Sequence, residues 1–477
     1  MKFRSVIWGI LSVMLFLLVS SLGVACAGGA SYTFYIDGSD YKAKNDLTGS
    51  IDFSGTDGAD VLQDTIDSLT TGGKIFLRHG VYTLDRDIEL KNHISLIGEG
   101  GDLSLVNGTV LKGYNITTAV LKTTSQITIT ICDLAVSVRS GSASACAIKV
   151  TPSDRSYIGG IAINSAPLDG LFINGGGVAL IENIRIDNVG RHGAVFYYVS
   201  DGVIRFIDTT AGSANSGRGI MITGGGHLRV YSCNTYLGYI GIEVSYAEDV
   251  DLIGVRANDN TQVGICVGDS TTKSIRFIGG SSYCNGESGY RIYNGKDVSL
   301  VSVKSYNNHA NGIKVEGGSN INIIDAGVYD DQMTHTQYRG LSVTGGDKIR
   351  ISDFKSPGGH IYYDVNLSGG TNVSLRGGQF TSVYNTVGAE INDVTGYVTA
   401  KSGVASVSNG GTIAHGLAGI PTTYNVTTTV PGYIAVVTGV DGTNLTIGLH
   451  RPGSSGGIEG VTTPASVSWH AEYHPQP

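Results

Sequence analysis

Three side chains that could perform acid–base chemistry stand at matching places in a repeated pattern. Asp169, His192 and Arg218 each come directly before a glycine that opens a short apolar segment. Arg191 lies beside His192, and Glu243 follows on the next repeat, one strand position further along. If successive repeats stack in register, these groups meet on one outward face. They could then bind a uronate and remove the proton next to its carboxylate, or hydrolyse a glycosidic bond by acid and base catalysis.

The competing interpretation of these residues is structural. A solvated polar edge with an ion pair would use the same residue types at the same spacing. We treat Asp169, His192, Arg218 and Glu243 as candidate catalytic residues and Arg191 as a candidate substrate-binding residue.

Tyrosines are the second kind of candidate, because aromatic rings can pack against sugar faces. Tyr283, Tyr306 and Tyr329 recur at intervals of 23 residues, which stacks their rings on successive repeats. Pointing inward they would form an aromatic core ladder, which we favour, and pointing outward a platform for pyranose rings. Adjacent tyrosines are better candidates for sugar stacking, because alternation along a strand turns one member of each pair to solvent. These are Tyr197 with Tyr198 and Tyr362 with Tyr363.

A repeat of 22 to 28 residues positions these side chains. Segments of the form glycine, apolar, any residue, apolar begin at Gly170, Gly193, Gly219, Gly241, Gly264, Gly289, Gly312 and Gly340. A second alternating strand recurs inside each repeat, as at 250–253 and 275–278. The repeat is too short for a helix-containing crossover, so it predicts a coil that advances one strand spacing, roughly 4.8 Å, per turn. With weaker copies at both ends, about eleven coils are expected around residues 120–369.

Asparagines mark one corner of the predicted coil. Asn215, Asn260, Asn285 and Asn308 each stand four residues before a repeat glycine. An amide there can satisfy a tight corner and bond to its equivalent on the next coil. We interpret this series as a structural ladder and not as a binding motif.

An amphipathic helix is predicted from Asp57 to Leu69, where apolar residues repeat at three to four residues. It would cover the first coil, whose strand edges would otherwise be exposed. The quoted residues resemble the entry segment of the pectate-lyase-like superfamily of right-handed parallel β-helix proteins: Asp57-Gly58-Ala59, Gly72-Gly73-Lys74-Ile75-Phe76-Leu77, Gly80-Val81-Tyr82 and Ile94-Ser95-Leu96-Ile97-Gly98-Glu99-Gly100.

With the coils, this resemblance covers residues 40–395. It implies an all-β fold: a single-stranded right-handed parallel β-helix with an N-terminal capping helix and a small C-terminal β-sandwich-like domain. The resemblance does not indicate which activity the chain has. The superfamily includes polysaccharide lyases, glycosidases, epimerases, phage tailspikes and noncatalytic surface proteins.

Two catalytic patterns of that superfamily are not matched. Pectin hydrolases carry Asn-x-Asp, Asp-Asp, Gly-His-Gly and Arg-x-Lys in that order, but here Gly190-Arg191-His192-Gly193 precedes Asp330-Asp331 and no Arg-x-Lys follows. Calcium-dependent lyases need three carboxylates, whereas the outward column offers Glu243 among lysines and arginines. We therefore expect no metal and no other cofactor, with Ca²⁺ as an alternative that no motif supports. Asp330-Asp331 is expected to form a solvated turn, with a second binding site as the alternative.

Four parts of the chain are predicted. Residues 1–27 form an export signal, 28–56 a lead-in, 57–396 the capped β-helix and 397–477 a separate β domain rich in threonine and valine. Ser408-Asn409-Gly410-Gly411 and Trp469-His470-Ala471 make the last part resemble C-terminal modules of phage tail-fibre and other surface β-helix proteins. That resemblance implies capping, attachment or homo-oligomerisation.

The N-terminal segment predicts export. Lys2 and Arg4 precede an uncharged apolar run and the small residues Ala25-Cys26-Ala27. Lipidation at Cys26 or retention as a membrane anchor are the alternatives. Without residues 1–27 the chain has 30 basic and 40 acidic residues and a net charge of −10, which argues against nucleic acid as a partner.

Cysteines and glycosylation motifs fit an exported protein. The remaining cysteines, Cys132, Cys146, Cys233, Cys266 and Cys284, are expected to be core thiols, with a disulfide such as Cys132 to Cys146 as the alternative. Asn-x-Ser/Thr motifs at Asn107, Asn115, Asn366, Asn372, Asn425 and Asn444 would make a glycoprotein in an organism that uses them.

The sequence predicts a secreted or cell-surface β-helix protein that binds a polysaccharide or cell-surface glycan. Cleavage or modification of that glycan by lyase or glycosidase chemistry is the enzymatic form of this hypothesis. The alternative is a noncatalytic adhesive or tailspike-like structural protein. Convergence of Asp169, His192 and Arg218 in a groove would favour the enzyme, and a flat arrangement the structural protein.

Overall fold

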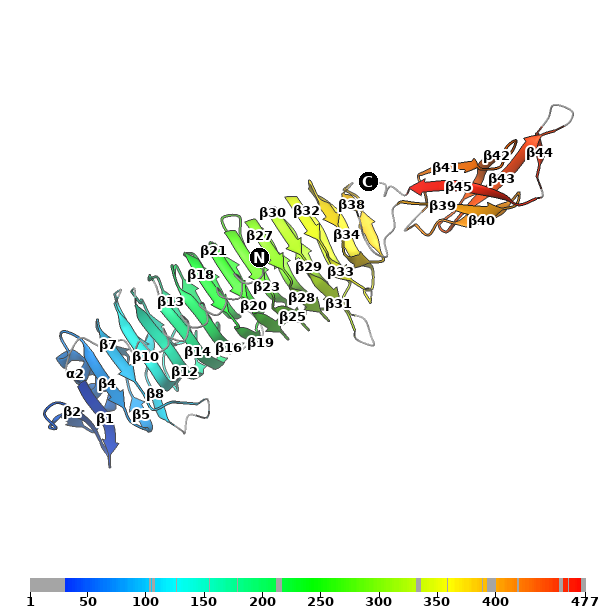
Figure 1. Ribbon diagram of the computed structural model, residues 1–477. Coiled ribbons are helices and arrows are strands. Elements are labelled where there is room, and N and C mark those ends of the chain that lie inside the picture. Colours follow the sequence, from blue (N-terminus) through cyan, green and yellow to red (C-terminus); the bar gives the residue numbers. More distant parts are fainter. Residues whose placement is uncertain are drawn as a thin grey trace, which may run out of the picture.

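The chain winds into a right-handed parallel β-helix of about 12 turns, followed by a small antiparallel β domain (Figure 1). The computed structural model describes residues 31–102, 104, 108–125, 127–153, 155–177, 179–211, 217–331, 336–357, 359–387, 389–392, 400–417, 420–453, 458–461 and 463–472. The predicted export signal with Cys26, the ladder residue Asn215 and the domain boundary at 396 lie outside these residues.

Three parallel sheets form the walls of the β-helix. Sheet 1 contains β6 (Ile88–Glu89), β9 (Ala119–Lys122), β11 (Cys146–Val150), β13 (Leu171–Asn174), β15 (Ala194–Tyr197), β17 (Arg218–Thr223), β20 (Ile240–Ser245), β23 (Val263–Val267), β26 (Ser288–Ile292), β29 (Asn311–Val315), the first part of β32 (Arg339–Ser352), β34 (Tyr363–Thr371) and β37 (Val383–Asn385).

Sheet 2 begins with β1 (Ser31–Asp37), β4 (Gly73–Leu77) and β7 (Ile94–Ile97). It continues through the first parts of β10 (Ile129–Val138), β12 (Ser156–Ala166), β14 (Ala179–Val189) and β16 (Val203–Ala211), then β18 (Gly226–Tyr231), β21 (Glu248–Ile253), β24 (Lys273–Ile278), β27 (Lys296–Val301), β30 (Ser319–Ile324), the last part of β32, β35 (Ser374–Arg376) and β38 (Glu390–Asn392).

Sheet 3 holds the remaining strand of each coil. It contains β5 (Gly80–Leu84), β8 (Thr109–Gly113), the last parts of β10, β12, β14 and β16, then β19 (Asn234–Tyr236), β22 (Arg256–Asn258), β25 (Ser281–Tyr283), β28 (Lys304–Tyr306), β31 (Gly327–Tyr329), β33 (Lys355–Ser356) and β36 (Gln379–Phe380). Inward-facing aliphatic side chains of all three sheets form one continuous core.

The repeat glycines mark the corner between sheets 3 and 1, where there is no room for a side chain. A Cβ built on Gly264 would lie 1.9 Å from Ser282 Oγ, and one on Gly289 would lie 2.0 Å from Ser305 Oγ. Both serine hydroxyls donate to a backbone carbonyl at this corner, such as Ser305 Oγ to Gly312 O at 2.7 Å. Close approach of neighbouring strands therefore explains the repeat that the sequence displays.

The predicted asparagine ladder is confirmed for Asn260, Asn285 and Asn308, all buried at this corner. The Nδ2 of Asn260 donates to Asn285 Oδ1, and that of Asn285 to Asn308 Oδ1, each at 2.9 Å. The ladder continues beyond the prediction. Gln337 Oε1 accepts the backbone N–H of Asn308 at 3.2 Å, and Gln337 Nε2 lies 3.2 Å from His360 Nδ1.

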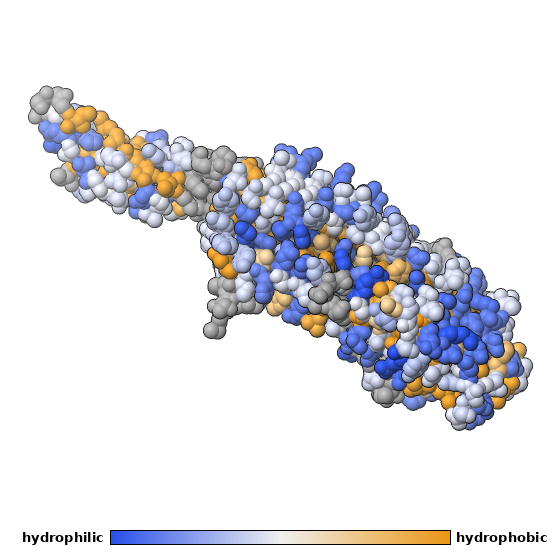
Figure 2. Space-filling model, turned by 180° about the vertical axis from the view of Figure 1, so that it is seen from behind, coloured by the Kyte–Doolittle hydropathy of each residue, from blue (hydrophilic) through white to orange (hydrophobic). Residues whose placement is uncertain are grey.

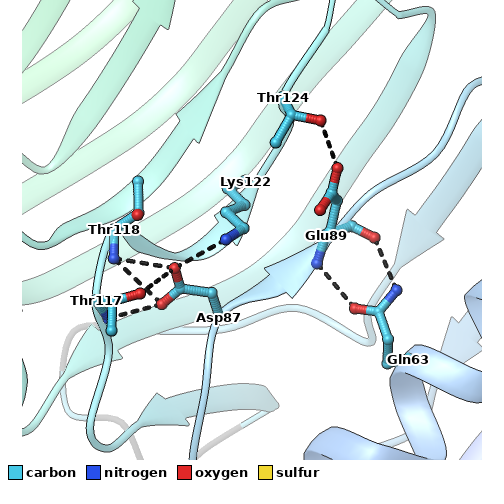
Figure 3. A network of polar contacts seen from close by, with 7 residues as sticks. All are labelled: Gln63, Asp87, Glu89, Thr117, Thr118, Lys122 and Thr124. Atoms are coloured by element: carbon cyan, nitrogen blue, oxygen red, sulfur yellow. Dashed lines mark hydrogen bonds and ion pairs between the residues drawn. The ribbon is translucent and has the colours of Figure 1, made fainter.

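The predicted capping helix is α2 (Gly58–Ser68), and its N-cap Asp57 accepts hydrogen bonds from Ala59 N and Asp60 N. The Gln63 side chain bonds the helix to the backbone of β6. Its Nε2 donates to Glu89 O at 3.1 Å, and its Oε1 accepts Glu89 N–H at 2.9 Å (Figure 3). The adjacent corner is held by Asp87, whose carboxylate accepts hydrogen bonds from Thr117, Thr118 and Lys122. α2 thus covers the first coils.

Further strands extend both ends of the molecule. In the lead-in, β1 pairs antiparallel with β2 (Asp40–Asn45), which pairs with β3 (Ile51–Gly55). The C-terminal domain has one sheet of β39 (Ala400–Val407), β45 (Ala465–Glu472) and β41 (Thr423–Thr428), and another of β40 (Gly411–Ala414), β43 (Asn444–Pro452), β42 (Ile434–Val440) and β44 (Ile458–Gly460). Their inner faces share one apolar core, as expected of a sandwich-like domain.

Two further expectations concern thiols and the membrane. The described cysteines, Cys132, Cys146, Cys233, Cys266 and Cys284, are free thiols, so the alternative of a Cys132 to Cys146 disulfide is wrong. Burial raises the pKa of Cys146 to about 11, which keeps that thiol protonated. Over the part of the chain that the structure describes, no helix combines the length and apolar character needed to cross a bilayer.

Candidate functional site

The β-helix brings Asp169, His192 and Arg218 together on successive coils of sheet 1. Gly170 N–H donates to His192 O at 3.0 Å, and Gly193 N–H donates to Arg218 O at 2.9 Å. The corner before each repeat glycine therefore stacks one candidate above the next, in the register expected from their spacing.

Asp169 forms an ion pair with Arg191. Its carboxylate has no exposed surface and accepts two hydrogen bonds from that guanidinium, from Nε at 2.9 Å and Nη2 at 2.7 Å. The backbone N–H of His192 donates a third at 3.2 Å. The hydrogen bonds to Asp169 raise the pKa of Arg191. Asp169 therefore fixes the position of Arg191, while that side chain remains 40% exposed.

His192 is 7% exposed, and its Nδ1 accepts the backbone N–H of Arg218 at 3.0 Å. Burial lowers the pKa of His192 to about 4, with Arg191 and Arg218 lowering it further and Asp169 opposing them. At neutral pH the ring is uncharged, and the bond at Nδ1 places its proton on Nε2. In this arrangement His192 can donate a hydrogen bond to a ligand, but accepting a proton would require Nδ1 to release the Arg218 amide.

Arg218 and Glu243 form an ion pair across neighbouring strands, with Nε and Oε2 2.6 Å apart. The candidate charges are thus paired two by two, Asp169 with Arg191 and Arg218 with Glu243. They lie together on the face of sheet 1.

An aromatic group lies along β11, β13 and β15 of the same sheet. The Tyr197 ring lies 6.3 Å from that of Phe172 and 4.6 Å from that of Tyr198, and Lys149 Nζ lies 5.4 Å from the centre of the Phe172 ring. Both tyrosines are exposed, Tyr198 by 57%. We call Lys149, Phe172, Tyr197 and Tyr198 the tyrosine patch.

Sequence reasoning missed Phe172 and assigned Lys149 no binding role. The available signal was the outward position of the segment Gly170-Leu171-Phe172-Ile173, where a large apolar ring has no core to enter. Such a residue beside an exposed tyrosine pair indicates a contact surface.

Tyr283, Tyr306 and Tyr329 point outward from sheet 3 and are half-buried, so the favoured expectation of a core ladder is wrong. Inward positions of these short strands hold Ser282, Ser305 and Val328. The rings stack face to face, with centroids 4.6 and 4.9 Å apart. Since neighbouring rings cover each other's faces, the ladder leaves no gap for a sugar between them.

Tyr362 and Tyr363 lie far from His192. From β15 to β34 there are seven strand spacings, which corresponds to roughly 34 Å. Tyr362 makes an edge contact with Tyr338 at 5.6 Å, and Tyr363 stacks on Tyr384 at 5.3 Å. The structure therefore does not join these tyrosines to the other candidates.

A charged network lies between the two aromatic groups. Glu316 accepts from Arg291 at 2.7 Å and from Lys314 at 2.5 Å, and Glu287 lies within 4 Å of both cations. Burial alone would raise the pKa of Glu316, but these hydrogen bonds hold it below its usual value. Within the described residues, no three His, Cys, Asp or Glu side chains are grouped as a metal site would require.

Comparisons with known proteins agree on the fold. The model of the right handed beta helix region matches residues 118–279 and 169–326. The fold resemblance seen in the sequence is confirmed at this level. No curated protein matches the chain.

Several solved structures are similar in fold. The A-module of Azotobacter vinelandii mannuronan C-5 epimerase AlgE4 is 15% identical, with 71% of this chain and 93% of that chain covered and a TM-score of 0.46. The tailspike gp49 of Pseudomonas phage LKA1 is 11% identical, with 87% and 92% covered and a TM-score of 0.49. DFA-IIIase of Arthrobacter chlorophenolicus A6 without its lid is 11% identical, with 71% and 94% covered and a TM-score of 0.49.

Proposed function

We propose that this chain binds a polysaccharide on sheet 1, at the tyrosine patch and at Arg191, which precedes the strand β15 that ends at Tyr197. The observation that carries this proposal is the exposed pair Tyr197 and Tyr198, of which Tyr197 contacts Phe172, with Lys149 Nζ over the Phe172 ring. Exposed aromatic faces offer apolar area to sugar rings, and cations offer donors to their oxygens.

Arg191 is prepared for such a role. A guanidinium has five N–H donors, and Asp169 uses two of them. The remaining donors belong to a side chain that is partly exposed and held in one orientation by a buried carboxylate. A fixed donor loses less side-chain freedom on binding than a mobile one.

Catalysis is the second candidate function. The notable feature is the neutral His192, whose Nε2–H can donate to a bound sugar oxygen beside Arg191 and Arg218. As arranged, these residues polarise and position a substrate more readily than they remove a proton. Lyase or glycosidase chemistry at Asp169, His192, Arg218 and Glu243 therefore stands as a hypothesis, and a noncatalytic adhesive or tailspike-like protein stands as its alternative.

Binding can be tested with immobilised polysaccharides, by comparing the wild type with Tyr197→Ala/Tyr198→Ala. Loss of two exposed aromatic contacts should weaken binding at least about tenfold. Tyr114→Ala, which removes an exposed ring directly after β8 of sheet 3, is the matched control and should bind normally. Equal binding by all three proteins, or no binding by the wild type to any polysaccharide, would refute the proposal.

Turnover is tested separately on the same panel. Unsaturated uronate absorbance reports lyase activity, and new reducing ends report hydrolysis. If the candidate residues are catalytic, His192→Ala should abolish the signal while polysaccharide binding persists. An active wild type whose activity survives in His192→Ala would exclude this site, and an inactive wild type that still binds would favour the noncatalytic alternative.

We infer export and a cell-surface or secreted location from residues 1–27. Mass spectrometry of the mature protein distinguishes the two forms, because signal cleavage gives an unmodified N-terminus near residue 28 and lipidation gives a diacylglyceryl Cys26. A mature chain that still begins at Met1 would contradict both.

A further inference from the structure

A hollow of about 430 Å³ opens beside sheet 1, at the corner that precedes β29, β32 and β34. Its lining residues are Gly286, His309, Ala310, Thr336, Tyr338 and Ile361. Asp330 holds one lining segment in place, because one carboxylate oxygen accepts the backbone N–H groups of Thr336 and Gln337, both at 2.8 Å.

Unsatisfied polar atoms gather around this hollow. Six buried side-chain nitrogen or oxygen atoms of the described residues have no hydrogen-bond partner, and three of them are Asn311 Oδ1, Thr336 Oγ1 and Arg339 Nε. Thr336 lines the hollow, while Asn311 and Arg339 directly follow lining residues and face each other in register on β29 and β32. Buried polar groups are normally satisfied, so such a cluster marks this corner as a departure from the regular coils.

Arg339 also differs from the other arginines of sheet 1. Arg191, Arg218 and Arg291 each contact a carboxylate at 2.6 to 2.7 Å. Among the described residues no carboxylate pairs with Arg339; its guanidinium instead lies 5.6 Å from the centre of the Tyr362 ring. A half-buried cation without a counter-charge favours an anionic ligand.

We propose that this hollow, with Arg339 at its edge, is a separate site for a carboxylate-bearing sugar. Arg339 would bind the carboxylate, and Tyr338 and Tyr362, exposed by 44% and 59%, would pack against the ring. A sugar acid supplies the anion and the apolar ring face together.

This site is independent of the tyrosine patch. Six strand spacings separate β15 from β32, which corresponds to roughly 29 Å along the helix axis. Each site can therefore be removed without touching the other. A long acidic polymer lying along sheet 1 could reach both.

The test uses an array of oligosaccharides that contain uronates or sialates, each beside its carboxyl-reduced counterpart. The full chain should bind at least one acidic glycan, and both carboxyl reduction and Arg339→Met should weaken that binding about tenfold or more. Arg350→Met is the matched control, because Arg350 lies on the same strand but on sheet 2, bonded to Asn320. It should bind as the wild type does.

Two further variants keep the test decisive. Tyr338→Ala/Tyr362→Ala removes the two exposed rings of the site and should weaken binding of the same glycan, while Tyr197→Ala/Tyr198→Ala should retain binding that depends on both Arg339 and the carboxylate. Unfolding midpoints verify that each variant is folded. The site is refuted if no acidic glycan binds, if reduced glycans bind equally well, or if Arg339→Met binds as the wild type does. In the last case, glycan binding lost only with Tyr197 and Tyr198 would leave the proposed function intact.

Discussion

At the scale of single residues, the buried carboxylate of Asp169 determines how the Arg191 side chain is oriented. It has no contact with solvent and depends on Arg191 and the His192 amide for all the hydrogen bonds that the structure shows. Its role is to orient a neighbour. Asp169 is therefore a positioning residue for Arg191, and any catalytic role for Asp169 would first require that ion pair to open.

The dependence of Asp169 on its partner predicts the effect of Arg191→Met. We expect the free energy of unfolding to fall by roughly 3 kcal/mol, because the variant leaves a buried carboxylate without a counter-charge. Urea or thermal unfolding measures this loss. Adding Asp169→Asn should recover part of it, whereas a single variant as stable as the wild type would contradict the assigned role.

His192 predicts a pH dependence of stability. Its pKa in the folded state is about 4, below the ordinary 6.5, because the ring is buried. The unfolded chain therefore binds a proton first, so this residue makes stability fall as the pH drops from 6.5 towards 4, by roughly 3 kcal/mol at most. His192→Asn can still accept the Arg218 amide but cannot titrate. Denaturant unfolding should show a shallower acid loss for the variant, and an identical loss would exclude His192 as its source.

Residue spacing alone predicted which candidates share a column of sheet 1. It did not predict how they pair, because Asp169 meets Arg191, which lies one residue away from the column. The spacing also did not predict burial, since Asp169, His192 and Arg218 could have been exposed to solvent at the same spacing. The Arg339 site escaped prediction because its evidence is a guanidinium that pairs with no carboxylate among the described residues, and the sequence does not show which charges lie near each other.

At the scale of structural elements, the buried amide ladder joins coils that otherwise share only strand pairing and core contacts. Asn285 is central: its Oδ1 accepts from both the backbone and the side chain of Asn260, and its Nδ2 donates to Asn308. The ladder therefore ties three successive corners into one hydrogen-bonded unit.

Asn285→Ala should lower the unfolding midpoint markedly, because it leaves buried groups of Asn260 and Asn308 without partners, at about 1 to 3 kcal/mol for each such group. Asn322→Ala, at a half-buried outward position of β30, is the matched control and should change the midpoint little. Differential scanning calorimetry compares the two variants. Similar midpoints for both would show that the ladder contributes nothing to stability.

The spacing of the asparagines predicted this ladder but not its full length. Gln337 stands three residues before Gly340 and His360 precedes no repeat glycine, so a search for asparagine four residues before glycine passes over both. For the three stacked tyrosines, the period of 23 residues predicts that the rings stack but not whether they point inward or outward. On β25, β28 and β31 the inward position is occupied by a smaller side chain that fits beside the corner, so the tyrosines point outward.

At the scale of the whole molecule, the repeat, the capping helix and the separate C-terminal domain could all be anticipated from the sequence. Each is set by local rules: the glycine corner, the three-to-four residue period of α2, and the change of composition near residue 397. Function is different. The regular coils offer an extended face, and the candidate binding groups on it are interruptions of the repeat, such as the exposed rings at Tyr197 and Tyr198.

The C-terminal domain carries an exposed apolar stripe, which is visible on the small domain in Figure 2. In one of its two sheets, Ile434 and Val436 of β42 and Ile458 of β44 are exposed apolar residues. Apolar area of this kind on a domain surface indicates contact with another molecule, and a second copy offers the same surface.

We therefore expect the full chain to self-associate through this domain. Ile434→Lys/Val436→Lys places two charges on the stripe and should shift the protein towards the monomer without lowering the unfolding midpoint of the β-helix. Thr412→Lys, at an exposed position of β40 in the same sheet, is the control and should leave the assembly unchanged. Sedimentation velocity at micromolar concentration measures the shift. A wild type that is already monomeric there would show that the stripe serves a different partner, because a surface made for self-association should be occupied under those conditions.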